Sequence, residues 1–144
     1  MIVLFDANVI LDILLKREPT FENSYNSVTL SLKNNDKCMI SASSVADIYY
    51  ILRKALKDKE KAKKKLESFL SIFSIATVDE KVIKNAFSLS GKDFEDDIVY
   101  SLAVASKCEY LVTNNISDFT QGEIIKVLLP NGFIKSRQKS GFSN

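Results

Sequence analysis

The chain has 144 residues, 46% of them hydrophobic, and a formal net charge of only +2, so any affinity for nucleic acid must come from the local distribution of charge. It contains no histidine, which excludes Ser-His-Asp and Cys-His nucleophilic catalysis and every His-ligated metal site. The two isolated cysteines predict reduced, buried thiols in a cytoplasmic protein. Because the chain has no long apolar run, we expect no membrane span and no signal peptide.

Short apolar segments alternate with longer amphipathic ones along the chain. We expect strands at residues 2–5, 37–41, 74–78, 109–113 and 123–128, and helices at 7–17, 21–35, 43–58, 59–73, 79–91 and 93–108. The helix at 21–35 should carry an apolar stripe of Phe21, Tyr25, Val28 and Leu32. Residues 131–144 lack periodicity and should form a partly disordered tail. The sequence therefore predicts one α/β domain over residues 1–130, with a parallel sheet covered by helices on both faces.

Acidic and amide side chains follow the predicted strands. Asp6 and Asn8 come after the first strand, and Asp47 lies in the first turns of the helix after the second. Thr113, Asn114, Asn115 and Asp118 follow the fourth strand, and the helix before that strand begins with Asp93, Glu95, Asp96 and Asp97. Because ligands of open α/β sheets bind outside the carboxyl ends of the strands, we expect these groups to converge at one crevice.

Each of these acids also has an ordinary structural interpretation. Ser44 and Asp47 have the spacing of a helix N-cap with an acid three residues later, and Asp93 and Asp96 repeat it. Acids in the first turn of a helix are favoured by the helix dipole. Asp118 fits a turn aspartate. Asp6 is more informative, because apolar residues flank it on both sides.

Taken together, the acids indicate a cation site. Two carboxylates about 5 Å apart repel by roughly 3 kcal/mol at an effective dielectric constant of about 20, so a cluster of several needs cations or bound protons. Since neither histidine nor paired cysteine is available, oxygen ligands favour Mg²⁺ or Mn²⁺. Such an ion activates water and clamps a phosphodiester during in-line displacement, a reaction that needs no histidine.

Three segments resemble the PIN-domain family of metal-dependent ribonucleases, which includes VapC-like toxins. They are LFDANVILDILLKREP, ISASSVADIYYILRKAL and DFEDDIVYSLAVASKCEYLVTNNISDF, and the resemblance covers about residues 1–130. It implies a three-layer α/β/α sandwich with a mostly parallel five-stranded sheet, and a homodimer in many members. It also implies that Asp6 is a central metal ligand, that Asp96 is a second, with Asp97 as an alternative, and that Asp47 stands at the place of another family acid.

The resemblance further implies that Asn8 and Thr113 orient the ligands by hydrogen bonds. Many family members carry an acid two residues after the threonine, where this chain has Asn115. Asn115 is therefore expected to orient ligands, and Asp118 to substitute as a fourth metal ligand. This departure leaves open whether the site holds one ion or two.

A basic segment lies between Arg53 and Lys65, with eight basic and two acidic residues. We interpret Arg53, Lys54 and Lys57 as contacts to an RNA backbone, because phosphate contacts of this kind supply affinity that is independent of sequence. The alternative is a solvated helical face that keeps the protein soluble.

The function hypothesis is therefore a Mg²⁺- or Mn²⁺-dependent endoribonuclease that cleaves single-stranded RNA, with Asp6, Asp47 and Asp96 as catalytic acids. The resemblance adds the role of a toxin with a small antitoxin partner. Two alternatives stay open. One is a PIN-like module that binds RNA or protein through a degraded site. The other is a phosphatase with Asp6 as nucleophile, although Asn8 stands where such enzymes carry a general acid.

Overall fold

The sheet has five parallel strands. The computed structural model describes residues 1–142, and within them the strands are β1 (Ile2–Phe5), β2 (Lys37–Ser41), β3 (Ser74–Ala76), β4 (Tyr110–Val112) and β5 (Lys126–Leu128). Their order across the sheet is β3-β2-β1-β4-β5, and every neighbouring pair is parallel. The chain adds β2 and β3 on one side of β1, and then β4 and β5 on the other side. The strand order therefore reverses between β1 and β4, which is where such sheets bind ligands.

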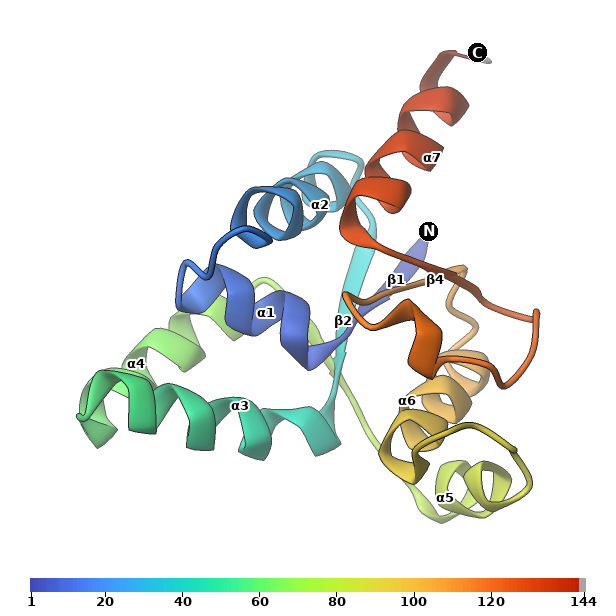
Figure 1. The fold of residues 1–144 in the computed structure, drawn as a ribbon, viewed down its shortest axis with the longest axis horizontal. Coiled ribbons are helices and arrows are strands. Elements are labelled where there is room, and N and C mark those ends of the chain that lie inside the picture. The colour runs from blue at the N-terminus through green and yellow to red at the C-terminus, as the bar shows by residue number, and fades with distance from the viewer. Residues whose placement is uncertain (143–144) are drawn as a thin grey trace.

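Seven helices within the described residues surround this sheet (Figure 1). They are α1 (Ala7–Leu14), α2 (Phe21–Lys33), α3 (Ala42–Leu56), α4 (Lys59–Leu70), α5 (Glu80–Phe87), α6 (Phe94–Ala105) and α7 (Pro130–Phe142), with a short 3₁₀ helix at Ile116–Asp118. Figure 1 shows α5 and α6 on one side of the sheet and α1–α4 on the other. The predicted α/β/α architecture is confirmed.

Alternation along β1 explains the two layers. Val3 and Phe5 are fully buried in the core that α1–α4 and α7 share, whereas Leu4 is buried in the core beneath α5 and α6. Successive side chains of a strand point to opposite faces, so a strand covered on both faces must be apolar at every position. For this reason the run IVLF contains no polar residue until Asp6, at the strand's end.

Helix α2 packs through a different face from the one predicted. Tyr25 is 49% exposed and Leu32 37% exposed, whereas Val28 is buried as predicted. The rest of the buried face consists of Ser24, Ser27 and Ser31. Ser24 and Ser31 donate hydrogen bonds to the buried carboxylates of Asp12 and Asp36, a pairing that an apolar-stripe analysis cannot detect.

The C-terminal segment also differs from the prediction. In place of an irregular tail after Pro130, helix α7 runs to Phe142, and residues 143–144 lie outside the described part. Phe133 is fully buried and packs edge-on against Phe5 and Tyr110. Arg137 forms an ion pair with the buried Asp36, which precedes β2. One aromatic side chain and one ion pair therefore anchor a helix that lacks an amphipathic repeat.

Along residues 1–142, no helix has both the length and the apolar character that crossing a bilayer requires.

Candidate active site

Asp6 occupies the junction of β1 and α1. Its backbone N–H donates to the carbonyl of Val112 in β4 at 2.9 Å, which continues the pairing of the two central strands. Its carboxylate caps α1, because Oδ1 accepts the backbone N–H of Ala7 at 2.8 Å. The other oxygen, Oδ2, accepts the hydroxyl of Thr113 at 2.8 Å and the amide Nδ2 of Asn8 at 3.2 Å. Asp6 is thus both a helix cap and the centre of a polar cluster.

Thr113 joins the ends of β1 and β4. Its side chain is completely buried, and its hydroxyl donates to Asp6 while accepting the backbone N–H of Asn115 at 3.1 Å. Asn8 also reaches this hydroxyl, with an Nδ2–Oγ1 distance of 3.3 Å. Asn115 therefore contributes through its backbone, while its side chain is exposed.

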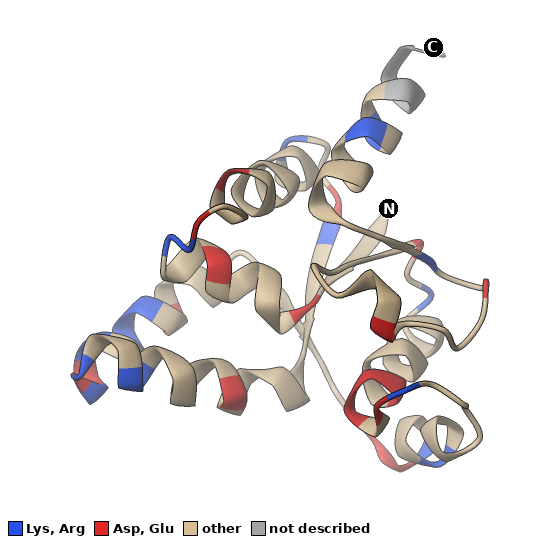
Figure 2. Ribbon diagram, in the orientation of Figure 1, with Lys and Arg blue, Asp and Glu red and all other residues tan. Residues whose placement is uncertain are grey.

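Three of the predicted acids line one cavity of about 250 Å³. Asp6 comes from the end of β1, Asp47 from α3 and Asp96 from the first turn of α6. Ser43, Ser44 and Glu95 also line this cavity. Figure 2 shows acidic segments at the β1–α1 junction, within α3 and at the start of α6. Of the acids expected to converge at the carboxyl edge of the sheet, Asp6, Asp47, Glu95 and Asp96 line this cavity, whereas Asp97 and Asp118 do not.

Three helix N-termini contribute to the electrostatics of this cavity. Asp6 is the N-cap of α1, Ser41 that of α3 and Asp93 that of α6, and each accepts a backbone N–H with its side chain. Since the N-terminal end of a helix carries partial positive charge, this arrangement favours anions at the cavity. Both carboxylates and phosphate oxygens are anions of this kind.

The pKa values of Asp6 and Asp96 are both raised above the ordinary value for aspartate. Burial raises the pKa of Asp96 to about 7, and the negative charges of Asp6, Asp93, Asp118 and Glu95 add to the shift. Burial also raises the pKa of Asp6, although hydrogen bonds from Thr113, Ala7 and Asn8 oppose this effect. A pKa of about 7 for Asp96 indicates that burial and the neighbouring negative charges outweigh the partial positive charge of the helix N-termini.

Asp96 and the neighbouring Asp97 point to different places. Asp97 is 5% exposed and accepts the side-chain amide of Gln121 at 2.8 Å. It also lies against Gly91, where a Cβ atom would collide with its carboxylate. Asp96 lines the cavity with Asp6, whereas Asp97 ties α6 to the loop before β5. The geometry thus favours Asp96 over Asp97 as the group that can act beside Asp6.

Comparison with known proteins gives this arrangement a family. A family model described as "PIN domain" matches residues 2–117. The chain belongs to the PIN domain family. Its sequence is 28% identical to ribonuclease VapC1 of Aquifex aeolicus over 123 residues, which cover 82% of this chain and 84% of that protein.

Solved structures of the same fold come from several bacteria. One of them is the structure of VapBC2 from Rickettsia felis bound to a fragment of its promoter DNA. It matches with a TM-score of 0.70 and 28% identity, and the match covers 88% of this chain and 97% of that one. A toxin-antitoxin complex from Klebsiella pneumoniae matches with a TM-score of 0.66 and 19% identity, and the match covers 89% of this chain and 97% of that one. The second likeness is one of fold alone.

The donor set of this PIN domain suits a hard divalent cation. Carboxylates and hydroxyls line the cavity, and oxygen ligands are those that Mg²⁺ and Mn²⁺ prefer. Among the residues described, however, no three carboxylate or thiol side chains are arranged so that they could hold a metal ion together. The fit is therefore one of chemistry and location, and the carboxylates of Asp6, Asp47 and Asp96 are not arranged here to share one ion.

Asp118 lies beside the cavity and does not line it. It is half-buried at the end of the 3₁₀ helix, and its charge contributes to the raised pKa values of both Asp6 and Asp96. The turn after β4 thus brings the predicted fourth acid within electrostatic reach of the other acids.

The basic residues lie at the opposite end of α3 from the acids (Figure 2). Lys57 is ten residues after Asp47, which is about 15 Å along a helix at 1.5 Å per residue. The guanidinium of Arg53 lies 5.6 Å from the ring centre of Tyr50, and the ammonium of Lys54 lies 4.7 Å from it. One helix therefore joins the acidic cavity to the basic surface.

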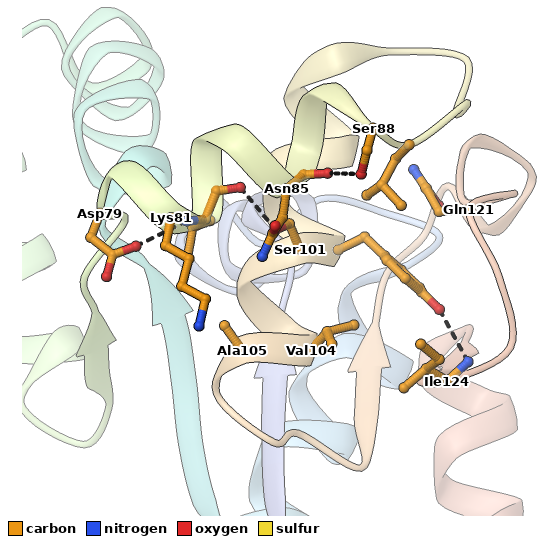
Figure 3. A pocket seen from close by; sticks show the side chains of 12 residues that line it. Asp79, Lys81, Asn85, Ser88, Ser101, Val104, Ala105, Gln121 and Ile124 are labelled. Atoms are coloured by element: carbon orange, nitrogen blue, oxygen red, sulfur yellow. Dashed lines mark hydrogen bonds between the residues drawn. The ribbon is translucent and has the colours of Figure 1, made fainter.

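A second cavity, of about 540 Å³, lies between α5 and α6 (Figure 3). Its walls are mainly apolar, and its only acid is Asp79, which caps α5 by accepting the backbone N–H of Val82 at 2.9 Å. Although this cavity is larger, it offers no group of carboxylates for a cation. The smaller, acidic cavity is therefore the better candidate for an active site.

The sequence analysis missed Asp12. This residue is 3% exposed in α1, accepts three hydrogen bonds, from Arg17, Ser24 and Asn114, and forms an ion pair with Arg17. The available signal was the one that singled out Asp6, namely an acid within the apolar run VILDILL. Ser43 was also missed as a lining residue, and nothing in its spacing distinguishes it from an ordinary first-turn helix residue, whereas Glu95 was among the acids expected here.

Proposed function

We propose that this chain is a Mg²⁺- or Mn²⁺-dependent endoribonuclease that hydrolyses phosphodiester bonds of single-stranded RNA. The observation that carries the proposal is the shared cavity of Asp6, Asp47 and Asp96 beside the point where the strand order reverses. The likeness to ribonuclease VapC1 of Aquifex aeolicus, at 28% identity over most of both chains, supports it.

In this proposal, Asp6 and Asp96 are the principal metal ligands, with Asp47 as a third and Asp118 as a candidate fourth. A bound divalent ion supplies a water of lowered pKa and stabilises the negative charge that develops on the phosphate. The amide of Asn8 and the hydroxyl of Thr113 hold Oδ2 of Asp6, so the carboxylate keeps one orientation. The helix N-termini around the cavity favour the phosphate of the substrate.

The basic residues at the end of α3 suggest where the RNA strand lies in this proposal. Lys54 and Lys57 are exposed and Arg53 is partly buried, at the end of α3 farthest from Asp47. In the proposal these three residues bind phosphates of the strand whose scissile bond lies in the acidic cavity. Such contacts do not depend on base identity.

A role as the toxin of a toxin-antitoxin pair is part of the same proposal. The likeness to VapBC2 of Rickettsia felis and the fold-level likeness to the Klebsiella toxin-antitoxin complex support a small antitoxin protein as partner. A cytoplasmic location agrees with the free, buried Cys38 and Cys108. The family resemblance also supports a homodimer, which light scattering would measure.

Cleavage of a labelled single-stranded RNA with Mn²⁺ tests the proposal. Asp6→Asn should lower the rate by at least about 100-fold, because it removes the charge of the central ligand. Asp79→Asn is the matched control, since Asp79 also caps a helix but lines no part of the acidic cavity. Equal cleavage by wild type and Asp6→Asn in nuclease-free preparations would reject the proposal.

Two observations favour the alternative of a binding module without catalysis. No described group of three metal-ligating side chains is preassembled, and Asn115 stands where many family members carry an acid. A thermal-shift titration separates the two functions, because a ligand that binds only the folded state raises its melting temperature. If Mn²⁺ leaves the melting temperature unchanged, the binding module becomes the better reading. The phosphatase hypothesis gains no support, since the amide of Asn8 donates to Asp6 and cannot act as a general acid.

A further inference from the structure

The buried carboxylate of Asp12 has no part in the chemistry proposed above. Its Oδ1 accepts the Nε of Arg17 at 3.0 Å, and its Oδ2 accepts Ser24 Oγ at 3.0 Å and Asn114 Nδ2 at 2.6 Å. A buried charge is retained at a cost in desolvation, and apolar replacements of similar size are often as stable.

Two of these partners lead to the same residue, Asn8. Asn114, whose side chain is bound to Asp12, donates its backbone N–H to Asn8 Oδ1 at 3.0 Å. Arg17, whose Nε is bound to Asp12, donates its Nη2 to the backbone carbonyl of Asn8 at 3.2 Å. Asp12 thus fixes both the side chain and the main chain of Asn8 through separate intermediaries.

The orientation of the Asn8 amide matters for Asp6. A side-chain amide has a donor end and an acceptor end, and rotation by half a turn exchanges them. Because Asn114 donates to Oδ1 of Asn8, the Nδ2 end must face Asp6 Oδ2 and Thr113 Oγ1. Without that constraint the carbonyl end could face the Asp6 carboxylate and repel it.

We propose that Asp12 is a positioning residue for the acidic cavity, because the Asp12–Asn114–Asn8 hydrogen bonds and the Asp12–Arg17–Asn8 contacts orient the Asn8 amide toward Asp6. Its importance for RNA cleavage rests on the proposed function. The proposed effect of Asp12 on the orientation of Asn8 does not depend on that function.

Asp36 provides the matched control. It too is a buried carboxylate, 9% exposed, that pairs with an arginine, Arg137, and accepts a serine hydroxyl, that of Ser31. It precedes β2, at the edge of the sheet opposite to Asp6. Asp36→Asn should therefore reproduce the loss of a buried ion pair without reaching Asn8.

The first experiment compares Asp12→Asn with Asp36→Asn in the metal-free protein. The side-chain amide resonances of Asn8 in ¹H–¹⁵N spectra should move in Asp12→Asn and stay in place in Asp36→Asn. Unchanged Asn8 resonances in folded Asp12→Asn would overturn the proposal. If Asp12→Asn does not fold, Asn114→Ala, which keeps the Asp12–Arg17 ion pair, takes its place with the same two outcomes.

The second experiment measures Mn²⁺ affinity and the rate of RNA cleavage at saturating substrate. Partners that orient a metal ligand typically change affinity or activity by about 10- to 100-fold, and we expect a loss in that range for Asp12→Asn and little change for Asp36→Asn. The losses in Asp12→Asn and Asn114→Ala should not add in the double variant, because both act through Asn8. Full additivity would contradict the proposal.

Failure of the function and failure of the inference give different results. If the wild-type protein cleaves no RNA but the Asn8 resonances still move in Asp12→Asn, the proposed function is rejected and the positioning role is supported. If cleavage is normal in wild type and the Asn8 resonances and Mn²⁺ affinity are unchanged in Asp12→Asn, the positioning role is rejected alone.

Discussion

Asp96 shows how a single residue couples this fold to its chemistry. Its pKa rises from the ordinary value of 3.8 to about 7 because it is buried beside other carboxylates, so the folded protein holds a proton there that the unfolded chain has lost. Stability then falls as the pH rises through the interval between the two values. A cation in the cavity would relieve the repulsion and reverse the trend.

We predict that the metal-free protein loses stability between about pH 4 and about pH 7, with a contribution from Asp96 on the order of 1 kcal/mol after allowance for solvent screening. Asp96→Asn should remove this contribution and melt at a higher temperature than wild type at about pH 8. Asp97→Asn is the control, because it removes the charge that strengthens the hydrogen bond from Gln121 and should only destabilise. Melting curves across the pH range measure both, and a wild-type protein that is more stable than Asp96→Asn at the upper pH without metal would contradict the prediction.

At the scale of elements, helix α3 connects the two halves of the proposed function. Its first turns face the acidic cavity and its last turn carries Arg53 and Lys54, with Lys57 as the capping residue in the left-handed conformation at φ 54°. The stacked positions of Arg53 and Lys54 over Tyr50 hold two of these cations near the surface of one helix.

We predict that the double variant Lys54→Ala/Lys57→Ala binds single-stranded RNA more weakly and with a shallower dependence on salt. Each lost phosphate contact should lower the slope of log affinity against log salt by about 0.7. The double variant Lys81→Ala/Lys84→Ala on α5 is the control, since it removes the same charge from the other side of the sheet. Fluorescence anisotropy at several salt concentrations measures the slopes. Equal slopes for all three proteins would refute the assignment of α3 as the RNA-binding helix.

Elements also show what the sequence can and cannot predict. All five strands were predicted because buried parallel strands read as short apolar runs, and Asp6 was singled out because it interrupts one. Helix α7 was missed because its place depends on Phe133 and Arg137, whose partners, Phe5 and Asp36, are distant in sequence. The buried serine face of α2 was missed for the same reason. Ser24, Ser27 and Ser31 recur at helical spacing, but an apolar pattern does not count serine, and the acceptors of Ser24 and Ser31 lie on other segments.

At the scale of the whole molecule, topology brings the site together. Residues 6, 47, 96 and 113 belong to separate segments, and they meet because parallel strands carry their carboxyl ends to one edge. The sequence could predict this convergence, but not which of Asp96 and Asp97 faces the cavity, because that depends on the rotation of α6 about its axis. It also could not predict the hydrogen-bond partners of Asp12, because Ser24 and Asn114 lie on two other segments.

Diffraction from crystals grown with Mn²⁺, measured at a wavelength where manganese scatters anomalously, tests the central claim most directly. The account predicts a manganese peak in the cavity of about 250 Å³, bound by carboxylate oxygens of Asp6 and Asp96. An empty cavity, at a Mn²⁺ concentration that supports RNA cleavage in solution, would contradict it.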